Sequence, residues 1–499
     1  MSEKDEHRLI AVRKEKLEAL KERGEYYPND FKPTCTIAEV RRLYEGREPQ
    51  EIEADARTFR LAGRVVALRD FGGGTFLVIQ SASGRIQVFM SKSKLGTEEF
   101  KATKRLLDVG DVIGVEGGAF VTKRGELTIN ADSVRILVKS LRPLPEKWHG
   151  LVDPELRYRQ RYVDLIANQQ AREIFVRRAK IIGYIRSFLV DNGFLEVETP
   201  MMQPIAGGAA ARPFITHHNA LDVDLFLRIA PELYLKRVLV GGFDKVFELG
   251  RCFRNEGIST QHNPEFTMCE FYWAYATFED LMSLIEEMLR GLVQELFGST
   301  TISYQEQTIE FAEPFRRIRL EDAVSEFAGI PPERLRDAAF LLDEVEKREI
   351  EVKGGTSWGE LVYLLFEKEV EHRLVQPTFV THFPVAVSPL ARRNEDDPEL
   401  VDRFELYVGG REIANAFSEL NDPFDQRERL EQQLKRREAG DEEAHMMDED
   451  FITALEYGMP PAAGAGIGID RLVMLLCDVP SIREVILFPQ LRPKERSQA

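Results

Sequence analysis

The sequence predicts a two-domain α+β protein, in which a small closed β-barrel of the OB type precedes a larger domain of helices and strands. Three observations support this fold class. The chain has 499 residues, more than one ordinary hydrophobic core accommodates. Residues 59–129 contain five short segments typical of strands, several of them separated by glycine-rich breaks. Beyond residue 150, long helical patterns alternate with strands.

The first domain begins with a predicted charged helix over residues 1–24, in which four apolar residues fall near helical spacing: Leu9, Val12, Leu17 and Leu20. The five predicted strands cover residues 61–66, 75–79, 85–89, 111–115 and 127–129. Five short strands in so few residues suit a small closed barrel. We therefore expect an N-terminal helical extension at residues 1–56 and an OB-type domain at 57–142.

The second domain follows a predicted linker at residues 143–165, which contains Pro143, Pro145 and the stretch 148–150. From residue 166 to 499 the sequence predicts one large domain. Its strongest helical patterns cover residues 172–192, 278–297 and 357–370.

Composition excludes several classes of protein. No apolar run is long enough to cross a bilayer, and residues 1–24 lack the apolar core of a signal or transit peptide, so we expect no membrane partner. The four cysteines are scattered and form no CxxC pair, which favours a reducing, cytoplasmic location over a zinc or disulfide framework. The net charge of −17 counts against nucleic-acid binding, but residues 57–69 and 157–161 are locally basic and leave it open.

Residues 245–275 predict a hairpin that carries chemistry. Strands at 245–254 and 265–274 flank a polar loop that contains Glu256 and His262. Because side chains alternate along a strand, Arg254 shares a face with Glu248, and on the return strand one face collects Phe266, Met268, Glu270 and Tyr272. An arginine, an aromatic ring, a carboxylate and a phenol together predict a site for a ligand with a phosphate, a flat ring and a cation. The alternative is a hairpin with a solvated polar face.

Residues 402–421 predict a second hairpin, turning at Gly409 and Gly410. This turn predicts that Tyr407 pairs with Glu412 and Glu405 with Ala414, so that Glu405 and Glu412 point to the same side. Two such carboxylates suit Mg²⁺, which would bind ATP phosphates; the alternative is a pair of exposed glutamates. In a regular strand three further residues would face away from Glu412, unless a bulge or twist intervenes: Asn415, Phe417 and Glu419.

Residues 464–471 form a glycine-rich segment that ends at Arg471, where a helix is predicted to begin. Glycines let a ligand approach the backbone closely. The segment lacks the βαβ setting of a dinucleotide site, and the sequence contains no GxxxxGK[ST] phosphate-binding loop.

These segments resemble the motifs of class II aminoacyl-tRNA synthetases. Residues 194–200 look like motif 1, which builds the homodimer interface in that family; residues 251–257 with 262–266 look like motif 2, and residues 466–471 look like motif 3. Subclass IIb members have an N-terminal OB domain that binds the anticodon and a catalytic domain built on an antiparallel sheet flanked by helices. The lysine branch is indicated by residues 228–236, 410–415 and 417–422.

The resemblance implies activation of L-lysine with ATP to lysyl-adenylate and pyrophosphate, followed by transfer of lysine to the 3′ terminal adenosine of tRNA(Lys). The catalytic residues would be Arg254 at the α-phosphate and Arg471 near the γ-phosphate. Glu405 and Glu412 would carry Mg²⁺, with about three ions per active site. Other ATP-binding positions match Glu256, His262, Asn263 and Phe266, the last of which would stack on adenine. No general base is needed, because the lysine carboxylate is already a nucleophile.

The resemblance also assigns a lysine pocket and an anticodon site. Positions that receive the ε-ammonium match Glu270, Tyr272 and Glu419; those that hold the α-amino group match Glu232 and the backbone at Gly208; Asn415 and Phe417 complete the pocket. Anticodon positions match Phe76, Gln87 and Glu126, although Phe76 could instead be barrel core. Gln261 stands where many relatives have Arg or Thr, which implies a weaker phosphate contact there.

Three other functions are alternatives to lysine activation. An aspartyl- or asparaginyl-tRNA synthetase would share both domains, but its aspartate pocket would need a cation where Glu270 and Glu419 stand. A paralogue that modifies a protein would lack the OB domain. A non-enzymatic scaffold would have no need of the ATP-binding residues Arg254, Glu405 and Arg471.

Overall fold

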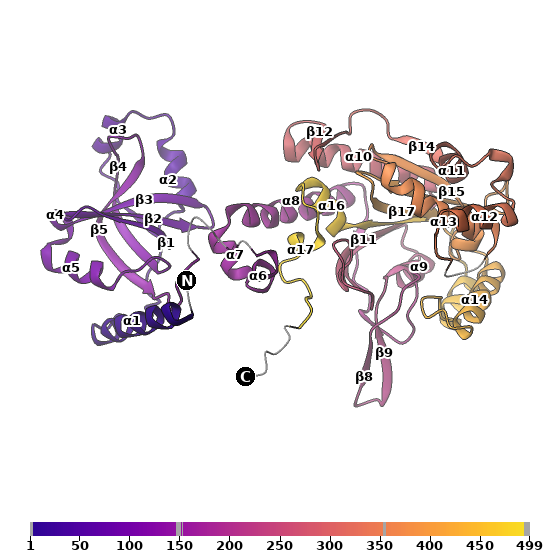
Figure 1. The fold of residues 1–499 in the computed structure, drawn as a ribbon, viewed down its shortest axis with the longest axis horizontal. Coiled ribbons are helices and arrows are strands. Elements are labelled where there is room, and N and C mark those ends of the chain that lie inside the picture. Colours follow the sequence, from indigo (N-terminus) through magenta and orange to yellow (C-terminus); the bar gives the residue numbers. More distant parts are fainter. Residues whose placement is uncertain (1–2, 146–150, 152, 353–355, 494–499) are drawn as a thin grey trace. The chain divides into compact units, whose positions relative to one another are not determined.

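The computed structural model describes residues 3–145, 151, 153–352 and 356–493, and the chain divides into two compact units at residues 1–152 and 153–499. The predicted N-terminal helix is present as α1 (Glu3–Glu22) (Figure 1). Its Leu17 and Leu20 are buried, whereas Leu9 and Val12 are exposed. The buried Arg13 fixes α1 to the first unit by donating hydrogen bonds to the carbonyl oxygens of residues 109, 140 and 142.

The first unit is the predicted closed barrel of five strands, in the order β1-β2-β3-β5-β4. The strands are longer than predicted: β1 (Phe59–Asp70), β2 (Gly74–Ser81), β3 (Gly84–Ser91), β4 (Val112–Val121) and β5 (Leu127–Val138). Because side chains alternate along β2, Leu77 and Ile79 lie in the barrel core, whereas Phe76 faces outward and is half-buried. The helices of this unit are α2 (Ile37–Tyr44), α3 (Pro49–Ala54), α4 (Lys92–Leu95) and α5 (Thr97–Leu106).

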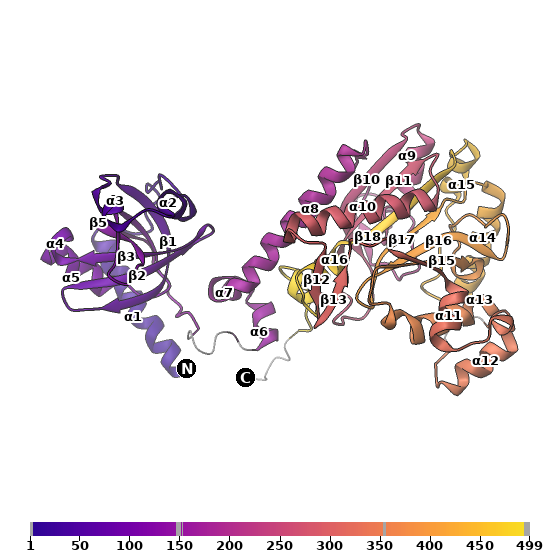
Figure 2. The same ribbon diagram turned by 90° about the horizontal axis from the view of Figure 1, so that it is seen from above.

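The second unit is built on an eight-stranded sheet, in the order β14-β15-β16-β17-β18-β11-β10-β6. Its central strands are antiparallel, and only the outermost pairs at each edge, β14 with β15 and β10 with β6, are parallel. The strands are β6 (Leu195–Glu196), β10 (Lys245–Phe253), β11 (Glu265–Ala274), β14 (Arg316–Arg319), β15 (Thr378–Pro384), β16 (Leu400–Tyr407), β17 (Glu412–Ser418) and β18 (Ala462–Gly468). Figure 2 shows β10, β11, β18, β17, β16 and β15 of this sheet side by side.

One face of this sheet is covered by helices α8 (Gln169–Asp191), α10 (Phe278–Phe297) and α16 (Ile469–Leu476). Their apolar side chains and those of Phe271, Ala414, Ala416 and Ile467 form one hydrophobic core. The predicted helix at 278–297 is confirmed, and a capping box between Thr277 and Asp280 starts it. The expected antiparallel sheet with flanking helices is therefore confirmed.

The second unit contains several further elements (Figure 1). The predicted linker 143–165 contains α6 (Pro154–Arg159) and part of α7 (Arg161–Ala167), and its residues 148–150 lie outside the described residues. The predicted helix at 357–370 divides into α13 (Trp358–Leu365) and a π-helical turn at Phe366–Val370. A second small sheet contains β7 (Met202–Gln203), β8 (Ile215–His218) and β9 (Val223–Leu227), and a third contains β12 (Thr301–Tyr304) and β13 (Gln307–Glu310). The other helices are α9 (Glu232–Val240), α11 (Leu320–Ala328), α12 (Ala338–Lys347), α14 (Pro423–Glu438), α15 (Glu449–Glu456) and α17 (Ile482–Val485).

The hairpin of β16 and β17 corrects one prediction. Tyr407 pairs with Glu412 as expected, but Glu405 pairs with Asn415 and not with Ala414. The register shifts because Ile413 is an extra residue in β17, and its side chain joins the apolar core. This bulge shifts the alternation by one residue, so that Asn415 faces the same side as Glu412.

No helix in the described parts of the chain is long and apolar enough to span a membrane.

Candidate active site

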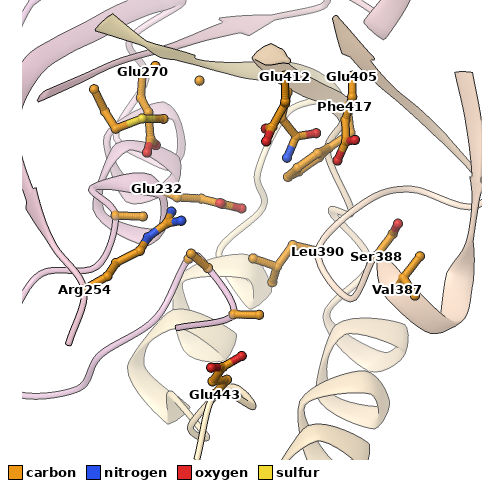
Figure 3. Close-up of a pocket in the computed structure, with 18 of the residues that line it drawn as sticks. Glu232, Arg254, Glu270, Val387, Ser388, Leu390, Glu405, Glu412, Phe417 and Glu443 are labelled. Carbon is orange, nitrogen blue, oxygen red and sulfur yellow. The ribbon is translucent and has the colours of Figure 1, made fainter. Parts of the chain in front are cut away.

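A pocket of about 560 Å³ lies on the face of the sheet opposite α10. Residues from β11, β16, β17 and β18 line it, together with the loop between β10 and β11, the N-terminal ends of α9 and α16, and the loops at 386–391 and 441–445. Figure 3 shows Glu232 and Arg254 pointing into the middle of this pocket, with Glu270 on one side and Glu405 and Glu412 on the other. The pocket is therefore a mainly acidic cavity with a guanidinium group near its centre.

Two arginines mark the part of the pocket where an anion fits. The Arg254 guanidinium lies 5.1 Å from the centroid of the Phe266 ring, and its buried Nε has no hydrogen-bond partner among the described residues. Arg471 donates from Nη1 to Glu412 Oε2 at 2.8 Å, and its Nη2 lies 3.4 Å from His262 Nε2. Partial burial, followed by the nearby Arg471, lowers the pKa of His262, which favours the neutral imidazole.

The two predicted metal-binding carboxylates both face the pocket, as the sequence suggested. Glu405 is buried and accepts hydrogen bonds from Arg403 and from the Tyr407 hydroxyl. Among the described residues, no group of three or more His, Cys, Asp or Glu is arranged to hold a metal ion. Two carboxylates that face the same cavity as Arg254 and Arg471 fit Mg²⁺, which takes one or two protein carboxylates and completes its shell with substrate phosphates and water.

Another part of the pocket is a buried acidic site. Glu270 accepts a hydrogen bond from the Tyr272 hydroxyl at 3.1 Å, and both residues are buried. Burial, followed by repulsion from Glu232, raises the pKa of Glu270 to about 8. Burial also raises the pKa of Glu419 to about 8, against the opposing effect of Lys236. Oε1 of Glu419 has no hydrogen-bond partner among the described residues, so it can accept a hydrogen bond from a cationic or hydrogen-donating ligand.

Two glycines make room for these acidic side chains. A Cβ at Gly464 would lie 2.3 Å from both Glu419 Oε1 and the Tyr272 ring. Gly208 has a φ of +90°, and a Cβ there would meet the Glu232 side chain at 2.9 Å. Only glycine lets the backbone approach the pocket this closely at either position.

The structure brings nearly all the sequence-predicted active-site residues together. One cavity is lined by Gly208, Glu232, Arg254, Glu256, His262, Asn263, Phe266, Glu270, Tyr272, Glu405, Glu412, Asn415, Phe417 and Arg471, and Gln261 lines it as well. Glu419 lies directly behind the lining, within contact of Gly464. Asn263 differs from the others, because backbone groups of Glu265 and Gln490 already occupy its side-chain amide.

The three predicted anticodon residues lie in the first unit. Phe76 and Gln87 are on neighbouring strands, facing outward, and the Phe76 ring packs on Phe89 with centroids 4.6 Å apart. Phe89 in turn contacts Phe120, with centroids 6.3 Å apart. Glu126 is exposed just before β5 and pairs with Arg41. The barrel thus presents a half-exposed aromatic face, and Phe76 is not part of its core.

Sequence reasoning missed several charged residues in the pocket lining or directly behind it, among them Lys236 and Arg403. Lys236 is completely buried and lies 2.7 Å from Glu232 and 2.5 Å from Glu419. Its spacing of four residues from Glu232 on a helix was a signal for pairing, but nothing local predicted its burial. Arg403 lies two residues before Glu405 and so on the same strand face, which could have identified it as a partner of that carboxylate.

Comparison with known proteins agrees with this arrangement. Residues 153–492 match the model of the class II tRNA synthetases (D, K and N), and residues 59–137 match that of the OB-fold nucleic acid binding domain. The chain is 53% identical to the lysine–tRNA ligase of Carboxydothermus hydrogenoformans, over 99% of this chain and 100% of that protein. It is 55% identical to that of Pelotomaculum thermopropionicum, over 99% and 96%, and 52% identical to that of Idiomarina loihiensis, over 99% and 98%.

The synthetase model covers nearly all of the second unit, and the relatives align over almost the whole chain. Both findings are consistent with the barrel, the antiparallel sheet and the acidic pocket. The chain therefore belongs to the class II tRNA synthetases and, within them, to the family of the lysine–tRNA ligases.

Proposed function

We propose that this chain activates L-lysine with ATP, forming lysyl-adenylate and pyrophosphate, and then transfers the lysyl group to the 3′ terminal adenosine of tRNA(Lys). The observation that carries this proposal is the buried acidic site of Glu270, Tyr272 and Glu419 in the same cavity as Arg254 and Arg471. A cationic side chain fits the first group, and a polyphosphate fits the second.

For the first step, one oxygen of the lysine carboxylate attacks the α-phosphorus of ATP, and the bond to the pyrophosphate oxygen breaks. Arg254 is the residue we assign to the α-phosphate, since its buried Nε has no hydrogen-bond partner in the described part of the chain and its guanidinium faces the cavity. A planar, permanently charged fork stabilises the charge that develops on the phosphoryl oxygens. We assign Arg471 to the γ-phosphate end of ATP. Glu256, His262 and Asn263 complete the ATP site. We assign the half-buried ring of Phe266 to stacking on adenine. Positioning supplies most of the catalysis.

Glu405 and Glu412 are the residues we assign to Mg²⁺, with about three ions expected once ATP is bound. The metal would neutralise phosphate charge and fix the polyphosphate for in-line attack. Arg403 pairs with Glu405 and Arg471 pairs with Glu412, so the protein itself balances the charge of these carboxylates. We therefore expect Arg471 to leave Glu412 when it binds phosphate.

Selection of lysine rests on net charge. Glu270, Tyr272 and Glu419 receive the ε-ammonium, and Glu232 with the backbone at Gly208 receives the α-ammonium; Asn415 and Phe417 line the space between. Lys236 does not turn this site into an aspartate pocket, since its single charge faces two carboxylates directly. A shorter or neutral amino acid would leave buried carboxylates unpaired, which is costly.

For the tRNA, we assign the anticodon to the outward aromatic face of the barrel, with Phe76 stacking on a base and Gln87 and Glu126 contacting base edges. Exposed aromatic rings beside polar side chains are the usual way of reading single-stranded loops. Gln87 accepts a hydrogen bond from Thr128, which holds its amide in place and leaves the NH₂ group to donate.

We further propose that the chain is a homodimer through the motif 1 region. This region and its surroundings expose a set of apolar side chains that a monomer would leave in water: Val176, Val190, Leu195, Met201, Met202 and Ile215. We place the enzyme in the cytoplasm, because all four of its cysteines are unpaired and two of them are buried.

The decisive experiment is ATP–pyrophosphate exchange without tRNA, with each standard amino acid in parallel. Exchange with lysine alone supports adenylate formation and the acidic pocket together. Exchange with aspartate or asparagine would show that Glu270 and Glu419 are wrongly assigned. No exchange with any amino acid would favour a scaffold, and charging of tRNA(Lys) would then decide whether the activity requires tRNA.

A further inference from the structure

Lys236 connects two parts of the pocket that are far apart in the sequence. Glu232 lies in the first turn of α9, one helical turn before Lys236, and Glu419 follows the end of β17. The Lys236 ammonium lies 2.7 Å from Glu232 Oε1 and 2.5 Å from Glu419 Oε2. Its side chain has no solvent exposure, and Phe417 covers it at 5.2 Å from the ring centroid.

The two carboxylates that Lys236 joins have different assignments in the proposed function, on which this inference rests. Glu232 is assigned to the α-ammonium of the substrate, and Glu419 to its ε-ammonium. In lysine these two groups lie at opposite ends of one side chain. The distance between the two carboxylates therefore determines which length of side chain can satisfy both at once.

We propose that Lys236 is a positioning residue that fixes the separation of the two ammonium subsites and so selects the length of the substrate side chain. One ammonium between two carboxylates holds both at a set distance. Each carboxylate keeps a second oxygen for the substrate, and Oε1 of Glu419 is buried, faces Gly464 and has no hydrogen-bond partner among the described residues.

A purely structural role would be the ordinary explanation of a Glu–Lys pair four residues apart on a helix. Such pairs are usually exposed and contribute little. Here all three charged groups are buried, and the second partner lies outside α9, directly after β17. An arrangement that only stabilised α9 would not need Glu419.

The test compares lysine with ornithine, which is one methylene shorter, by ATP–pyrophosphate exchange. Lys236→Met removes the connection, and we expect the kcat/KM for lysine to fall mainly through KM. The preference for lysine over ornithine should fall by about tenfold, a change typical of losing discrimination for one methylene. Lys236→Arg keeps the charge, which protects folding, but its longer side chain must move the carboxylates apart, so the same preference should fall several-fold.

The control is Lys245→Met, because Lys245 is a partly buried lysine of the same unit that does not contact the pocket. It contacts Trp273 and the carbonyl of Asn192 instead. Its preference for lysine should equal that of the unmodified enzyme. If folded Lys236→Met, or Lys236→Arg where the first variant does not fold, loses activity toward both substrates equally, Lys236 only supports the fold and the proposal is overturned. Failure of the unmodified enzyme to use lysine would instead overturn the proposed function.

Discussion

Glu270→Gln should lower activity and raise stability at the same time. Glutamine has nearly the same shape, and its carbonyl oxygen can still accept the hydrogen bond that Tyr272 donates. The substrate ammonium, however, loses a buried charged partner. Truncating one partner of such a pair costs about 2–5 kcal/mol, so the kcat/KM for lysine should fall by roughly thirtyfold to several thousandfold.

The gain in stability follows from the pKa of the same carboxyl group. Burial and Glu232 raise this pKa from 4.5 to about 8 in the folded protein, so the folded state holds a proton that the unfolded state releases. Stability therefore falls as the pH rises from 4.5 to 8. At pH 7 the loss is about 3 kcal/mol, at about 1.4 kcal/mol for each pH unit above 4.5. Glutamine does not ionise and avoids this loss.

The assay combines lysine-dependent pyrophosphate exchange with thermal unfolding of the unliganded enzyme at pH 5 and pH 8. We expect the Glu270→Gln variant to melt a few degrees higher than the unmodified enzyme at pH 8, and the difference to shrink toward pH 5. Glu265→Gln, an exposed position on the same strand, should change neither property. Full activity with lysine would refute the assignment of Glu270, and a lower melting temperature at pH 8 would refute the electrostatic reasoning.

Three further outcomes are expected. The affinity for lysine should rise from pH 6.5 to 8.5, because Glu270 and Glu419, whose pKa values are about 8, must ionise to receive an ammonium group; calorimetry that shows a constant affinity would contradict this. Gly464→Ala should raise the KM for lysine more than tenfold, since the new Cβ would lie 2.3 Å from Glu419 Oε1, whereas Gly183→Ala, with open space around it, should not. Phe76→Ala should weaken tRNA binding by roughly 5- to 150-fold, the loss of one base stack, without changing exchange measured in the absence of tRNA; an equal loss in both assays would mean that the barrel itself is damaged.

Much of the architecture could be predicted from the sequence, because the signals were local. Alternating apolar residues identified the barrel strands, and the capping residues Thr277 and Asp280 mark the start of α10. The hairpin of β10 and β11 was predicted with its faces, since a long regular strand keeps its alternation. The side chains of Arg254, Phe266 and Glu270 therefore lie in one pocket, as their spacing indicated.

The rest depends on contacts between remote segments. The bulge at Ile413 could not be located in advance, because the turn at Gly409 and Gly410 is compatible with a regular strand, and the apolar core decides which residue is displaced. The burial of Lys236 depends on Glu419, a residue 183 positions further along the chain. No local sequence pattern predicts a contact between residues so far apart in the chain.

The bulge at Ile413 determines which side chains of β17 face the pocket. Glu412, which we assign to Mg²⁺, precedes the extra residue, whereas Asn415, Phe417 and Glu419, which we assign to lysine, follow it. In a regular strand, residues three positions apart face opposite sides, and the extra residue brings Glu412 and Asn415 to the same side. Deleting Ile413 alone would leave these two residues two positions apart, so they would keep a common face while the core loses one apolar side chain. Deleting Ala416 with the bulge in place would instead turn Phe417 and Glu419 toward α10. The same one-residue change is therefore tolerated at the bulge but would move the residues assigned to lysine into the core a few positions later.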